Sequence, residues 1–131
     1  MTIAVISVAV MAITLFVLGF LVSVLRGQTD TIAYADGNDP TATLTKAVRG
    51  HGNSAEWVPI LSILILYLGT TDPAMWLQIL FAVIALARVL TVIGFLTCET
   101  LTKLHPLKAL GAMVTYIGGT ILAVMAVLSV I

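Results

Sequence analysis

The chain has 131 residues, of which 60% are hydrophobic and only 9% charged, and its six basic residues balance its six acidic ones. Soluble domains carry about a quarter charged residues, so this composition excludes an ordinary soluble fold and indicates a single unit within a lipid bilayer. Without a basic excess to neutralise phosphates, nucleic-acid binding is excluded as well.

Four apolar stretches are each long enough to cross a membrane. A bilayer core about 30 Å thick requires about 20 helical residues, and a helix satisfies its own backbone in lipid. The sequence predicts such helices over residues 3–25, 44–69, 74–97 and 107–131. The first has no basic residue before it, so we interpret it as a retained helix and not as a cleaved signal peptide. The predicted fold class is all-α, an integral membrane four-helix bundle.

Turn-forming residues precede the second and third predicted helices. The first loop contains the cluster Asp36-Gly37-Asn38-Asp39-Pro40. We expect Thr41 or Thr43 to cap the second helix, with Asp39 near its positive end. We expect Pro73 to occupy the first position of the third helix, where a missing N–H is tolerated.

The first half of the second helix is unusually polar for a membrane segment. Its polar and aromatic residues are Lys46, Arg49, His51, Asn53, Glu56 and Trp57. On a helical wheel Arg49, Asn53 and Glu56 fall within about 60° of one another, whereas His51 points about 160° away from Arg49. Polar groups are costly in a membrane and indicate a binding site by default.

This mixed set of groups suits a zwitterionic ligand such as a small peptide. An arginine binds a carboxylate, an asparagine recognises an amide, and a glutamate receives an ammonium group. The alternative is structural: Arg49 and Glu56 pair with each other or with other helices near the membrane surface.

A single charge, Arg88, interrupts the third predicted helix. It lies nine residues before the end, about 13 Å into the helix, where an arginine costs about 2.5–3.5 kcal/mol. It therefore needs a partner, and we expect Glu56 or a bound anion. A purely structural Arg88–Glu56 pair is the alternative.

Along the fourth helix, small residues recur every four positions, at Gly111, Thr115, Gly119 and Ala123. Such a ridge lets another helix approach closely in lipid, so we interpret it as a packing seam and not as a ligand groove. The single cysteine, Cys98, is interpreted as a bystander thiol, and no Cys/His cluster has metal-site spacing.

Basic residues gather at one end of the predicted bundle. Five of the six flank the first and third loops, namely Arg26, Lys46, Arg49, Lys103 and Lys108. The positive-inside rule places these loops in the cytoplasm and both termini on the other side. Compact loops without a sorting signal favour a bacterial inner membrane.

The run Arg49-x-His51-x-Asn53-x-x-Glu56-Trp57-x-Pro59 resembles the signature of the MAPEG family, the membrane-associated proteins in eicosanoid and glutathione metabolism. Chain length, four spans, the long first loop and an arginine in the third helix agree with this family. The resemblance implies a homotrimer of four-helix subunits, with glutathione bound between neighbouring subunits near the cytoplasmic side.

The resemblance also implies roles for individual residues. One side of the glutathione site would be formed by Arg49, Asn53, Glu56 and Trp57. His51 and Arg26 would reach the site from the adjacent subunit, and Arg88 would organise Glu56.

The departures from the family concern activation of the thiol. Relatives use an arginine near the start of the fourth helix; here the candidates are Lys103 and Lys108, and the sequence does not choose between them. Phe95 and Thr91 stand where relatives carry tyrosine, and Ala109 where one relative has serine. Lysine still stabilises a thiolate, as a point charge.

Two hypotheses of function follow. The first is a glutathione-binding membrane protein, a transferase or peroxidase in which glutathione is the co-substrate and hydrophobic electrophiles arrive from the bilayer. The alternative is a non-catalytic scaffold that binds a lipid or a partner protein through the same inter-subunit grooves. A transporter is disfavoured because the four helices lack internal repeats and broken spans.

Overall fold

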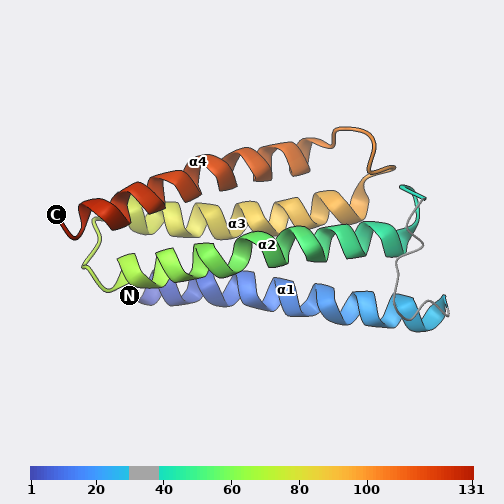
Figure 1. The fold of residues 1–131 in the computed structure, drawn as a ribbon, viewed down its shortest axis with the longest axis horizontal. Coiled ribbons are helices and arrows are strands. Elements are labelled where there is room, and N and C mark those ends of the chain that lie inside the picture. The colour runs from blue at the N-terminus through green and yellow to red at the C-terminus, as the bar shows by residue number, and fades with distance from the viewer. Residues whose placement is uncertain (30–38) are drawn as a thin grey trace.

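The computed structural model describes residues 1–29 and 39–131, so residues 36–38 of the predicted turn cluster lie outside the described residues. Four helices make up most of these two ranges: α1 (Thr2–Gln28), α2 (Thr43–Gly69), α3 (Met75–Thr97) and α4 (Pro106–Leu128) (Figure 1). Neither range contains a strand. The predicted all-α class is confirmed.

The helices alternate in direction along the bundle. Both termini lie at one end, together with the turn between α2 and α3, and the α3–α4 loop lies at the other end (Figure 1). The two middle helices, α2 and α3, each pack against all three others, while α1 and α4 lie on opposite sides of this central pair. We call the end that carries the α3–α4 loop the loop end.

Three of the four helices, α1, α3 and α4, are long and apolar enough to cross a membrane. The fourth, α2, is as long as α1 at 27 residues, but its first half carries the polar residues. Within this polar half the bundle partly buries Lys46, His51 and Asn53, which therefore have protein neighbours that an isolated span would lack. Arg49 and Glu56 are exposed.

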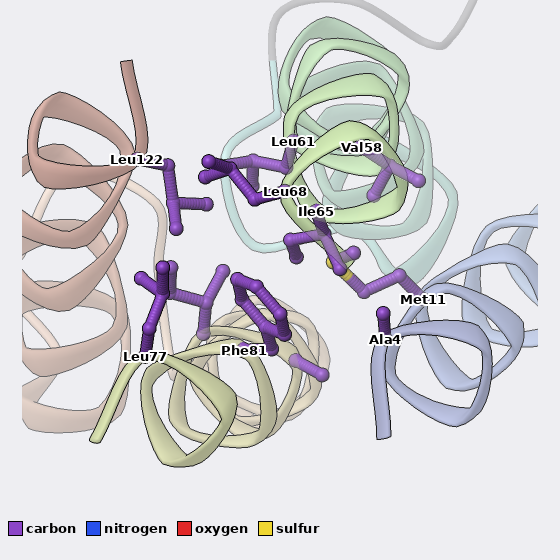
Figure 2. Packing of buried hydrophobic residues seen from close by; sticks show 11 residues of the cluster. Ala4, Met11, Val58, Leu61, Ile65, Leu68, Leu77, Phe81 and Leu122 are labelled. Atoms are coloured by element: carbon purple, nitrogen blue, oxygen red, sulfur yellow. The ribbon is translucent and has the colours of Figure 1, made fainter. Parts of the chain in front are cut away.

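The apolar core occupies the half of the bundle nearest the termini. Figure 2 shows its side chains gathered in the space between the helices. The core is built from the first halves of α1 and α3 and the second halves of α2 and α4, which meet because the helices alternate in direction. Its members are Ala4, Met11, Val58, Leu61, Ile65, Leu68, Leu77, Phe81, Ile84, Ala85 and Leu122. The loop-end half of the bundle is where the polar residues of α2 lie.

The predicted cap of α2 is wrong. Its N-cap residue is Ala42, and no side chain caps the helix. The Thr41 hydroxyl instead donates to Asp39 Oδ1 at 2.6 Å, and the Thr41 amide donates to the same oxygen at 2.8 Å. These two bonds form a tight turn before the helix and lower the pKa of the Asp39 carboxyl below its ordinary value. Thr41 is therefore engaged in the turn and does not reach the helix amides.

The predicted start of α3 is also wrong. Pro73 precedes the helix, which begins at Met75 after the N-cap residue Ala74. The turn before it contains Asp72 with a positive φ of 53°. Its left-handed backbone, followed by the extended Ala74, delays the helix past the proline.

The packing seam of α4 departs from the predicted ridge. The buried positions of this helix are Gly111, Thr115, Gly118 and Leu122. Gly119 and Ala123 instead line a groove between α2 and α4. Each four-residue step advances about 40° beyond a full turn, so three such steps rotate about 120° around the helix and leave the seam.

Replacing Gly111 by alanine is expected to destabilise the bundle by about 1–3 kcal/mol, the usual cost of overpacking. A Cβ at this position would contact the Thr91 hydroxyl and lie 2.7 Å from the backbone oxygen of Ala87, which cannot swing away. The matched control is Gly119→Ala, whose Cβ would meet Leu61 at an ordinary 3.4 Å. Thermal unfolding in detergent should separate the two variants. Equal midpoints would contradict this account of the α3–α4 contact.

Candidate functional site

A pocket of about 380 Å³ lies between α2, α3 and α4 in the loop-end half of the bundle. The described residues that line it are Arg49, Asn53, Trp57, Arg88, Thr91, Phe95, Leu101, Leu104, Lys108, Ala109, Ala112 and Tyr116. This volume is within the range of small-molecule sites, about 300–1,000 Å³. Three of these lining side chains are cationic, and none is a carboxylate. The pocket is therefore suited to an anionic group.

The buried cation of the pocket is Arg88, only 2% exposed. Its Nη2 donates to Asn53 Oδ1 at 2.8 Å and to the Asn53 backbone oxygen at 3.3 Å. Its Nε has no hydrogen-bond partner among the described residues. The guanidinium therefore retains a buried donor that a bound group can use.

The expected pair between Arg88 and Glu56 is not present. Asn53 is the partner of Arg88, and the Glu56 side chain is exposed. The two α2 residues point about 60° apart around the helix, so Asn53 faces α3 while Glu56 turns outward.

One face of α2 presents three pocket residues at successive turns. Arg49, Asn53 and Trp57 follow one another at four-residue intervals, and all three line the pocket. The Trp57 ring lies against that of Tyr116 on α4, with centroids 5.2 Å apart and planes tilted by 54°. From the loop end inward, this face of α2 thus presents the exposed Arg49, the partly buried Asn53 amide and the Trp57 ring.

The structure distinguishes the two candidate lysines. Lys108, in the first turn of α4, lines the pocket, and its Nζ lies 5.3 Å from the centroid of the Phe95 ring. The Lys103 side chain is 75% exposed and pairs with Glu99 at 3.6 Å outside the pocket. Because Glu99 partly compensates the charge of Lys103, Lys108 is the lysine placed to act on a bound ligand.

A family model described as the MAPEG family matches residues 4–128, nearly the whole chain. The chain belongs to the MAPEG family. No curated protein and no solved structure matches it. Membership, together with three helices able to cross a bilayer, makes the chain an integral membrane protein of the family concerned with glutathione and eicosanoid metabolism.

Besides Lys103, three predicted glutathione-binding residues of this MAPEG protein lie outside its pocket. Besides the outward-facing Glu56, these are Arg26 and His51. His51 faces α1, where a Cβ on Gly19 would lie 3.3 Å from its Nε2. Arg26 lies in the last turn of α1, a helix that contributes no described residue to the pocket. Both side chains are thus on the α1 side of α2.

Several residues that line the pocket were not predicted from the sequence. The most notable is Tyr116, which follows Lys108 by eight residues, with Ala112 midway between them. This four-residue spacing was a usable signal, because it places all three on one helical face. Leu101 and Leu104 come from the α3–α4 loop, where the Leu101 amide donates to the Pro40 oxygen at 3.0 Å. Nothing in their spacing indicates this position.

Proposed function

We propose that this MAPEG protein binds glutathione in the pocket between α2, α3 and α4 and activates its thiol for attack on hydrophobic electrophiles. One observation carries the proposal: five predicted site residues from three helices line one pocket that contains three cations and no described carboxylate. These residues are Arg49, Asn53, Trp57, Arg88 and Lys108. Glutathione has two carboxylates and a thiol, and its thiolate adds a third negative charge.

The polar groups of the pocket match the parts of the tripeptide. Arg49 is exposed and offers its guanidinium fork to a carboxylate. Asn53 accepts from Arg88 through Oδ1, so its NH₂ group is available to donate to a peptide carbonyl. The unpartnered Nε of Arg88 supplies a further donor inside the pocket. Glu56 is exposed beside Trp57 on the outer surface of α2, and in this proposal it receives the ammonium group of glutathione at the edge of the pocket.

Lys108 is the proposed activating residue, because a nearby cation lowers the pKa of a thiol and the thiolate is the nucleophile. The Thr91 hydroxyl already donates to the Ala87 oxygen at 2.8 Å, so it does not replace the tyrosine of relatives as a donor.

In both proposed reactions the proton of the glutathione thiol is released to water. In transfer, the thiolate forms a C–S bond as the leaving group departs with its electron pair. In peroxide reduction, two glutathiones and one hydroperoxide give glutathione disulfide, an alcohol and water.

The hydrophobic electrophile is proposed to lie in the groove between α2 and α4. This groove of about 300 Å³ shares Trp57 and Tyr116 with the pocket and continues past Leu61 and Leu64. Its lining is mostly apolar, as a substrate drawn from the bilayer requires. The shared aromatic pair would bring the reactive carbon next to the thiol.

The functional form is proposed to be a homotrimer with one glutathione at each subunit interface. His51 and Arg26 lie on the α1 side of α2, so they would complete the pocket of a neighbouring subunit. The Phe16 and Phe20 side chains on α1 are more than 70% exposed and would contact lipid or that neighbour. The concentration of basic residues at the loop end favours a cytoplasmic position for the pocket, in a bacterial inner membrane.

Calorimetric titration of the detergent-purified protein with glutathione tests the proposal. We expect saturable binding that Arg49→Ala weakens by about ten- to a hundredfold, because a hydrogen-bonded charged contact contributes about 1.5–3 kcal/mol. Lys103→Ala is the control, since it removes an equal charge from outside the pocket. Absence of binding in a folded trimer that retains lipid or another protein would instead support the scaffold alternative.

A further inference from the structure

The Lys108 ammonium lies against an aromatic ring and a backbone oxygen. Its Nζ is 5.3 Å from the centroid of the Phe95 ring, and it also donates to the Lys103 backbone oxygen at 3.5 Å. A lysine side chain has a flexible four-carbon stem, so a defined position for its charge requires such contacts. Phe95 and Lys108 both line the pocket, which places this contact at the ligand.

Two glycines determine how closely these side chains approach each other. A Cβ on Gly94 would lie 2.8 Å from the Lys108 amide nitrogen and 2.9 Å from its Cγ, so only glycine lets the first turn of α4 pack here. On the other side, a Cβ on Gly50 of α2 would lie 3.3 Å from the Phe95 Cβ. The α3 backbone at Gly94 therefore packs against Lys108, and the α2 backbone at Gly50 packs against Phe95.

We propose that Phe95 is a positioning residue that holds the Lys108 ammonium over the pocket through a cation–π contact, an inference that rests on the proposed glutathione activation. The face of an aromatic ring attracts a cation without carrying a neutralising charge. A carboxylate in the same place would compensate the ammonium. The phenylalanine side chain also accepts no conventional hydrogen bond, so the ammonium keeps N–H donors for the ligand sulfur.

The functional test measures the ultraviolet absorbance of the bound thiolate against pH. Phe95→Leu keeps an apolar side chain but removes the ring, so we expect the titration of bound glutathione to move up by about half a pH unit. At a pH below the transition this corresponds to about threefold less thiolate. Phe95→Trp should restore the wild-type titration, since indole is the best cation–π partner. Should the leucine variant not fold, Phe95→Met provides the same test.

Two controls separate positioning from packing. Affinity for S-methylglutathione, which has no ionisable thiol, should stay within about twofold of wild type in Phe95→Leu. The matched variant Trp76→Leu removes an exposed aromatic ring from the start of α3, at the end of the bundle opposite the pocket, and should leave the titration unchanged. A leucine variant with an unaltered thiol titration would overturn the proposal, as would a tryptophan variant that fails to restore it.

A second measurement requires no glutathione. The chain has three lysines, so reductive methylation with ¹³C-formaldehyde labels Lys46, Lys103, Lys108 and the N-terminus for NMR. We expect the Lys108 signal to show an upfield ring-current shift that Phe95→Leu removes without moving the other two lysines. An unmoved Lys108 signal would overturn the proposed contact. A shifted signal in a protein that fails to bind glutathione would refute the proposed function and its thiol role, but not the placement of the ammonium.

Discussion

Replacing Arg88 by methionine is expected to weaken glutathione binding at least tenfold while changing the stability of the protein little. The substitution removes a cation and a buried donor from the pocket, a loss of at least tenfold in affinity for a charged contact. It also leaves Asn53 Oδ1 without its 2.8 Å bond, at a cost of about 1–3 kcal/mol. The relief from burying an arginine in a membrane helix, about 2.5–3.5 kcal/mol, is of similar size and opposite sign.

Calorimetry and thermal unfolding of Arg88→Met, measured on the same preparation, distinguish a binding role for this residue from a purely structural one. Arg88→Lys is the informative companion, because it keeps the charge but loses the planar guanidinium that spans Asn53 and the pocket. We expect it to bind glutathione weakly. Wild-type affinity in the methionine variant, combined with a large loss of stability, would show that Arg88 only connects α3 to α2.

Replacing Lys108 by alanine is expected to shift the pH dependence of the thiol chemistry and to spare glutathione binding. A cation within about 4–6 Å lowers the pKa of an acid by about 1–3 pH units, so its removal should raise the thiol transition by that amount. Thiolate then disappears at neutral pH, where the wild-type protein would retain it. The rate should fall less than the thiolate population, because a more basic thiolate is intrinsically more nucleophilic.

The pH–rate profile with a hydrophobic electrophile measures this effect, and Lys103→Ala is the matched control. Lys103 has its own partner in Glu99 at 3.6 Å, so its loss should leave the profile in place. Lys108→Arg should retain a low transition because it preserves the positive charge. A pH–rate profile that shifts in Lys103→Ala but not in Lys108→Ala would show that Lys103 is the activating residue.

Much of the fold was predictable from composition and hydropathy. Lipid offers no hydrogen bonds to an open backbone, so long apolar stretches have to be helices, and α1, α3 and α4 follow directly. Helix starts were less predictable because short polar side chains have several local partners. Thr41 bonds to Asp39 instead of capping α2, and the left-handed Asp72 delays α3 past Pro73.

Within a single helix, periodicity was a partial guide to the site. The common face of Arg49 and Asn53 was predicted from the wheel, as was the opposite direction of His51, because 100° per residue determines directions along one helix. Glu56, predicted on the same face, instead turns outward and does not line the pocket. The sequence alone thus determined a membrane-embedded helical protein with a polar, ligand-suited face on α2. It also indicated membership of the MAPEG family, which the match over residues 4–128 shows.

Relations between helices were decided only by the tertiary structure. That Arg88 meets Asn53 and not Glu56, and that Lys108 and not Lys103 lines the pocket, depends on how α3 and α4 are rotated and how closely they approach α2. Helical periodicity carries no information on this, because rotation and approach are set by side-chain volume at contacts such as Gly94 and Gly111.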